Sequence, residues 1–122
     1  MLIVISPKET GISLSLVRYY GVVNILREII NRYMNQILVH SYLYSINEAI
    51  ITDYEWDLRA KKLVKLIEEN KEIAQTLPYY EQFIDWEGDT SMSFVYDDTI
   101  IRRAQMAYWA ETGKKLELDE LS

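Results

Sequence analysis

The sequence predicts an all-α fold, a small helical bundle of about four helices in which the N-terminal helix is the longest. The first observation is a run of apolar and aromatic residues between positions 19 and 44, spaced alternately by four and three, which is typical of a helix packed along another helix. The second is a helix-start signal at residues 52–55, followed by apolar residues at helical spacing. The third is a segment over 98–112 with acidic residues at its start and a glycine after its end.

The long helix carries an apolar seam that continues for more than three heptads. Its members are Tyr19, Val23, Leu26, Ile30, Tyr33, Ile37, His40 and Tyr44. Such a seam packs either against other helices of its own domain or, in part, against a second copy of the chain, which would give a homodimer through the long helix. The ten tyrosines fit both interpretations, because amphipathic rings suit half-buried cores and interfaces alike. Before this helix, residues 2–5 have the composition of a short strand.

The second helix is predicted over about 53–70. Thr52 and Glu55 form a capping box, and Asp57 and Lys61 are spaced as an i,i+4 ion pair. A short third helix over 71–77 ends before a proline, and one or two further turns are expected within 79–86.

The C-terminal part begins with a loop. Residues 87–91 carry the strongest loop signal in the chain, and the final helix covers 98–112 with Gly113 as the residue that ends it. The acidic tail from Leu116 onward is expected to fray. These elements form one helical domain, residues 1–122, without repeats or linkers.

Composition excludes several classes of function. The 122 residues include no cysteine and one histidine, which rules out disulfides, cysteine-held zinc and thiolate catalysis. The 13 basic and 19 acidic residues give a net charge of −6, which argues against direct binding of nucleic acid. No segment is long and apolar enough to span a membrane, and the first residues make a poor signal peptide, so we expect a cytoplasmic protein.

Charge is divided unevenly along the chain. Residues 1–66 carry a net charge of +2, and residues 67–122 carry −8. The acidic half is either a solvated surface that maintains solubility or a face for a basic protein partner. His40 is the only imidazole, and its neighbours Ser41 and Ser45 do not form a hydrolase site with it, so we expect a half-buried, hydrogen-bonded histidine.

One motif carries a resemblance to a known family. Residues 40–57 read HSYLYSINEAIITDYEWD, in which Tyr42-x-Tyr44 is followed by a turn and then by Asp53-x-x-Trp56-Asp57. This pattern resembles the small N-terminal helical subdomain of bacterial NAD-dependent DNA ligases. The chain is even more similar to short phage-encoded DNA ligase-related proteins, in which the likeness continues through segments seen here as 78–83, 88–90 and 101–104. On this basis the ligase-like helical core covers about 34–77, and an acidic helical part follows over about 78–115.

The resemblance implies a site for nicotinamide mononucleotide (NMN), the half of NAD that this subdomain recognises. It places Tyr44 and Trp56 where two rings stack on the nicotinamide, and Asp53 and Asp57 where carboxylates accept hydrogen bonds. Ser45 stands where the ligases usually have histidine, and Trp56 replaces a tyrosine. The same residues also have structural interpretations, because Tyr44 lies on the seam and Trp56 begins the apolar face of the second helix.

Ligase activity is not expected. The sequence contains no Lys-x-Asp-Gly motif for adenylate transfer, and 122 residues are too few for the nucleotidyltransferase domain that performs it. The prediction is therefore a non-catalytic binding module for NAD or nicotinamide mononucleotide, with no metal and no required cofactor. The alternative is a phage-encoded acidic interaction factor in the cytoplasm of a bacterial host, which would inhibit or modulate a host enzyme or defence system through its acidic or tyrosine-rich surface.

Overall fold

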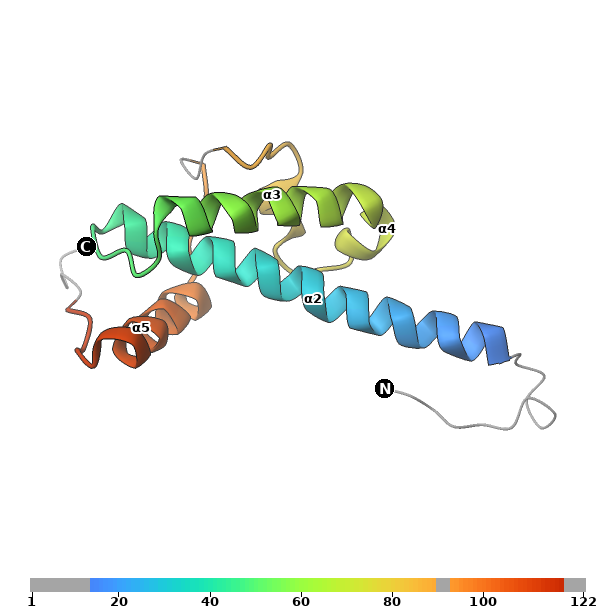
Figure 1. The fold of residues 1–122 in the computed structure, drawn as a ribbon, viewed down its shortest axis with the longest axis horizontal. Coiled ribbons are helices and arrows are strands. Elements are labelled where there is room, and N and C mark those ends of the chain that lie inside the picture. The colour runs from blue at the N-terminus through green and yellow to red at the C-terminus, as the bar shows by residue number, and fades with distance from the viewer. Residues whose placement is uncertain (1–13, 90–92, 118–122) are drawn as a thin grey trace.

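The computed structural model describes residues 14–89 and 93–117, with side chains from residue 18 onward, and is helical without a strand in these ranges (Figure 1). Its elements are α2 (Leu14–Ser45), α3 (Asp53–Glu69), α4 (Lys71–Ala74), the 3₁₀ turn η1 (Tyr80–Phe83) and α5 (Asp98–Thr112). The all-α class and the long N-terminal helix are thus confirmed. The strand expected at residues 2–5 lies outside the described residues. In the described part of the chain, no helix has the length and apolar character needed to cross a membrane.

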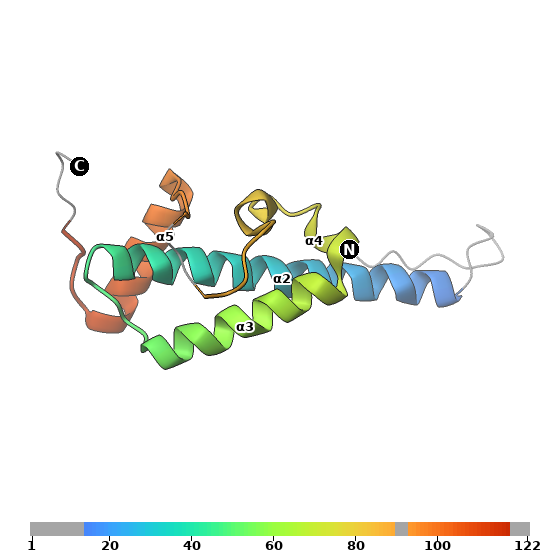
Figure 2. The same cartoon turned by 90° about the horizontal axis from the view of Figure 1, so that it is seen from above.

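The long helix α2 is the centre of the fold. Figures 1 and 2 show α3 folded back along one side of α2, while α5 crosses another side near the C-terminal end of α2. The helix α2 contacts α3, α4 and α5. The core forms between these helices, and its fully buried members on α2 include Ile30, Met34, Ile37 and Leu38. Because α2 is covered from more than one direction, its buried surface is wider than the single predicted seam.

The apolar seam is buried only where other helices cover it. Ile30 and Ile37 are fully buried, whereas Tyr19 and Tyr44 at the two ends of the seam are 60% and 61% exposed. Packing within the domain therefore accounts for the middle of the seam. The N-terminal end of α2 extends beyond α3 and α4 in both views (Figures 1 and 2).

Three predicted helix ends are present. The Thr52 hydroxyl accepts a hydrogen bond from the Glu55 amide at 3.1 Å and caps α3. The Asp97 carboxylate caps α5 by accepting from the Ile100 amide at 2.8 Å, and this bond is the main cause that lowers the pKa of Asp97. Gly113 ends α5 in the left-handed region, with φ of +70°.

The turn from α2 to α3 is closed by an asparagine. Asn47 adopts a φ of +65°, a conformation that asparagine tolerates better than most residues. The Glu48 amide donates to the Leu43 carbonyl at 2.8 Å, and the Asn47 amide donates to the Tyr44 carbonyl at 3.0 Å, which satisfies two of the last carbonyls of α2. The Tyr108 hydroxyl donates to the Glu48 carboxylate at 2.8 Å and joins α5 to this turn.

Aromatic side chains hold the segment after α4 against the helices. The Phe83 ring lies 5.2 Å from the rings of Trp86 and Phe94, and the Trp86 ring lies 6.1 Å from that of Trp56 on α3. Gly88 is buried against α3 with a φ of +87°. The backbone can approach α3 this closely because glycine has no side chain.

The start of the C-terminal tail differs from the prediction. Leu116 is only 6% exposed and belongs to the core cluster, so the chain does not fray at this residue. The burial of its apolar side chain outweighs the acidic, disordered character that the composition of the tail suggested.

Candidate functional site

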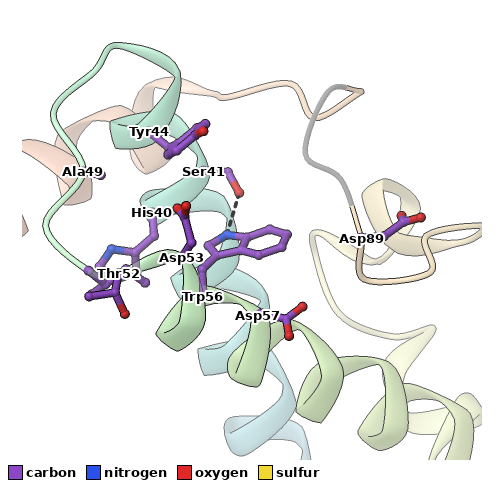
Figure 3. Close-up of a pocket in the computed structure, with 10 residues that line it drawn as sticks. His40, Ser41, Tyr44, Ala49, Thr52, Asp53, Trp56, Asp57 and Asp89 are labelled. Atoms are coloured by element: carbon purple, nitrogen blue, oxygen red, sulfur yellow. Dashed lines mark hydrogen bonds between the residues drawn. The ribbon is translucent and has the colours of Figure 1, made fainter.

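A pocket of about 440 Å³ lies at the junction of α2 and α3 (Figure 3). It is lined by His40, Ser41, Tyr44, Ala49, Ile51, Thr52, Asp53, Trp56, Asp57 and Asp89. Four of the five site residues expected from the sequence therefore surround one hollow. The fifth, Ser45, does not line it, and its hydroxyl donates to the Tyr42 carbonyl at 2.6 Å.

Helical spacing explains why these side chains meet. Ser41 and Tyr44 are three residues apart near the end of α2, and Asp53, Trp56 and Asp57 follow the same kind of spacing at the start of α3. Residues three or four apart lie on the same face of a helix. The short turn then brings these two faces together, as Figure 3 shows.

Trp56 forms a fixed wall of the pocket. Its indole Nε1 donates to the Ser41 hydroxyl at 3.1 Å, and its ring meets the Trp86 ring edge to face at an interplanar angle of 84°. Ser41 is only 1% exposed, so its hydroxyl is held in place by the surrounding core. An indole fixed from both sides offers a ligand a preorganised surface.

The pocket is acidic as well as aromatic. Asp53 and Asp57 line it together with the rings of Tyr44 and Trp56, and Asp89 borders it from the loop after η1, with its carboxylate drawn on the side away from the other lining residues (Figure 3). No lysine or arginine is among the described residues that form its walls. Carboxylates beside aromatic faces attract flat cations, and phosphate groups are repelled by the same charges.

The Asp57 carboxylate forms an ion pair with Lys61, one turn further along α3. Lys61 Nζ lies 2.8 Å from the Asp57 carboxylate, and the hydrogen bond between them is the main cause that raises the pKa of Lys61. Both side chains are well exposed, at 71% for Lys61 and 44% for Asp57. Exposed ion pairs of this kind contribute little free energy, so a ligand can compete for the Asp57 carboxylate.

His40 is a neutral ring in the pocket wall. Burial, followed by the nearby charge of Arg59, lowers its pKa to about 4, and Glu55 opposes this effect. Its Nδ1 atom is buried without a hydrogen-bond partner, contrary to the predicted hydrogen-bonded histidine. This Nδ1 atom therefore accepts no hydrogen bond from the neighbouring Ser41 hydroxyl, which itself accepts from Trp56.

Sequence reasoning missed part of the lining. The missed residues are His40, Ser41, Ala49, Ile51, Thr52 and Asp89. Helical spacing from Tyr44 could have indicated Ser41, whereas Asp89 comes from a distant loop and has no local signal. The residues described by the structure contain no group of three or more potential metal ligands.

No protein-family model, curated protein or solved structure matches this chain. The functional argument therefore rests on the pocket and on the residue pattern that predicted it.

Proposed function

We propose that the protein is a non-catalytic binding module that holds the nicotinamide end of nicotinamide mononucleotide or NAD in the pocket between α2 and α3. Its evolutionary identity would be that of a phage DNA ligase-related protein, which retains the recognition subdomain of NAD-dependent DNA ligase without the ligase chemistry. One observation carries the proposal: Tyr44, Asp53, Trp56 and Asp57, selected from the sequence for this role, line a single pocket.

The lining provides a role for each of these side chains. The oxidised nicotinamide ring is a flat cation, which gains from the π faces of Trp56 and Tyr44. Tyr44 is 61% exposed, so its ring can close over a ligand without leaving the core. The carboxylates of Asp53 and Asp57 can accept hydrogen bonds from ribose hydroxyls or from the carboxamide.

The charge of the pocket also predicts the orientation of the ligand. With three aspartates and no lysine or arginine among the lining residues, we expect the phosphate to point out of the pocket into solvent. Affinity should then depend on the positive charge of the ring. NADH, whose ring is neutral, should bind about 2- to 30-fold more weakly than NAD, given about 0.5–2 kcal/mol for a cation–π contact.

The test is a calorimetric titration with nicotinamide mononucleotide and NAD at concentrations up to the millimolar range. Tyr44→Ala and Asp53→Asn should each weaken binding. Tyr54→Ala and Glu68→Gln, which change similar exposed side chains on α3 outside the pocket, should leave affinity unchanged. Absence of heat and of a thermal shift with either ligand would refute the proposal, as would equal effects of the pocket variants and their controls.

A second candidate function is supported by the acidic surface beside η1. Glu81, Asp85 and Glu87 surround a shallow hollow of about 450 Å³ that also contains Ile84, which is 56% exposed. Acidic groups around an exposed apolar residue fit a basic protein partner, such as a bacterial host enzyme that a phage protein inhibits in the cytoplasm.

Affinity capture from bacterial lysate at low salt, followed by purification of the captured protein, tests this alternative. Direct binding of the purified partner should weaken at high salt and with Glu81→Gln combined with Asp85→Asn. Retained binding by that double variant would place the partner on another surface.

A further inference from the structure

The N-terminal end of α2 forms a projecting arm, defined here as residues 18–29. Figures 1 and 2 show this end of the helix extending past α3 and α4. The core cluster of α2 begins only at Ile30, after the arm. The Arg27 guanidinium donates to the Thr76 hydroxyl, a contact that marks where the arm leaves the body of the protein.

The arm exposes an unusual amount of apolar surface. Tyr19, Tyr20, Val22 and Ile25 are each 55–60% exposed. The arm continues the packed part of α2, so its helix needs no separate nucleation, but its exposed apolar side chains lie outside the core cluster, which on α2 begins at Ile30. A partner along the apolar face of the arm would supply the missing packing.

Two adjacent apolar stripes follow the arm. The first continues the seam, through Tyr19, Val23 and Leu26. The second is shifted by one position, through Val22, Ile25 and Ile29, and has the same alternating spacing of three and four. Stripes with this spacing form the contact surface of paired helices.

We infer that the arms of two copies of this chain pair antiparallel about a two-fold axis near residues 23 and 24. In this register Val22 of one copy lies against Ile25 of the other, twice. The register also places Arg18 of each copy beside Glu28 of the other, so each end of the contact gains an ion pair. A parallel pair would instead set Arg18 against Arg18 of the second copy.

Self-complementarity is what favours a second copy over an unrelated partner. The apolar centre and the flanking opposite charges of Arg18 and Glu28 match themselves under a two-fold rotation, as an isologous interface requires. The contact is short, about 18 Å along the helix, and smaller than a standard interface of about 1,600 Å². The dimer should therefore be reversible and depend on protein concentration.

Sedimentation equilibrium of the full chain tests the association. The average mass should rise from 14.5 kDa at low micromolar concentration toward twice that value at several hundred micromolar. Ile25→Glu should keep the protein monomeric, while Met106→Glu, at an exposed apolar position on α5, should not. A wild-type chain that stays monomeric throughout, or an Ile25→Glu variant that still dimerises, overturns the inference.

The absence of native cysteine allows a direct test of the register. Mixed Arg18→Cys and Ile29→Cys chains should form a heterodimeric disulfide, since these positions face each other in the antiparallel pair. Arg18→Cys alone should not crosslink, because the two copies of residue 18 are then about 16 Å apart along the axis, beyond disulfide reach. Efficient crosslinking of Arg18→Cys alone would overturn the antiparallel register. Circular dichroism confirms folding of each variant, and these outcomes are independent of nucleotide binding.

Discussion

Replacing Ser41 by alanine removes one hydroxyl from the floor of the pocket. That hydroxyl accepts a hydrogen bond from the indole Nε1 of Trp56 at 3.1 Å, and Ser41 is only 1% exposed. The substitution leaves the surrounding packing nearly unchanged, because alanine is smaller by a single oxygen atom. Its effect therefore measures how firmly the hydrogen bond holds the indole.

The expected loss of stability follows from the surroundings of Trp56. A neutral hydrogen bond contributes about 1 kcal/mol, and an unsatisfied buried donor costs up to about 3 kcal/mol. Trp56 is only half-buried and faces the pocket, so water can reach its Nε1 in the variant. We therefore expect Ser41→Ala to lower the free energy of unfolding by about 1 kcal/mol, or the Tm by roughly 3–5 °C for a domain of this size.

Urea denaturation of a double-mutant cycle isolates the free energy of the hydrogen bond between Ser41 and Trp56. The cycle combines Ser41→Ala with Trp56→Phe, which removes the donor, and should give a coupling energy of about 1 kcal/mol. Ser45→Ala, an exposed serine at the end of the same helix, controls for the loss of a serine hydroxyl that bonds only to the local Tyr42 carbonyl. A coupling energy within about 0.3 kcal/mol of zero would refute the view that Ser41 fixes the indole.

Three further predictions concern backbone, protonation and capping. Gly88→Ala should destabilise the protein by roughly 2 kcal/mol in urea denaturation, because the alanine would have to keep a φ of +87° and its Cβ would lie 3.0 Å from Val64 Cγ2. The matched change Gly21→Ala places its Cβ where no heavy atom lies within 4 Å, so it should stabilise the protein by about 0.5–1 kcal/mol. The pKa of His40 is lowered from 6.5 to about 4, so the folded state favours the neutral ring and the wild-type Tm should fall as pH falls from 6.5 toward 4. In thermal melts over the same range, His40→Gln should show a smaller fall in Tm, because it has no imidazole to protonate. Asp97→Ala should cost about 1–2 kcal/mol by chemical denaturation, because its carboxylate caps α5; an unchanged midpoint would show that the cap is dispensable.

Elements that depend on local signals were predicted well from the sequence. The capping box at Thr52 sets the start of α3, and Asp97 and Gly113 set the two ends of α5 at the predicted residues. Each signal acts through atoms within a few residues, so the sequence alone contains the relevant geometry. Tyr44 and Trp56 line the same pocket, but the family resemblance, and not a local signal of this kind, selected them.

Features that depend on tertiary contacts were predicted less well. Met34 and Leu38 are fully buried although they lie outside the apolar seam, because α2 is covered by helices on more than one side. The burial of Phe94 and Leu116 and the approach of Asp89 to the pocket arise from how the C-terminal segment folds back, which no local pattern encodes. The sequence predicted one or two helical turns within 79–86, but it did not predict that residues 80–83 form a 3₁₀ helix.

The shared position of Trp56 restricts how this pocket can diversify. Its indole is a wall of the pocket and also a neighbour of Trp86, which packs on the buried Phe83. A substitution that changes what this wall recognises would also disturb the aromatic packing that holds the 83–94 segment in place. Exposed Tyr44 and Asp53 carry no such double requirement. Evolutionary change in which molecules this pocket can hold should therefore proceed through its rim, with the tryptophan wall retained.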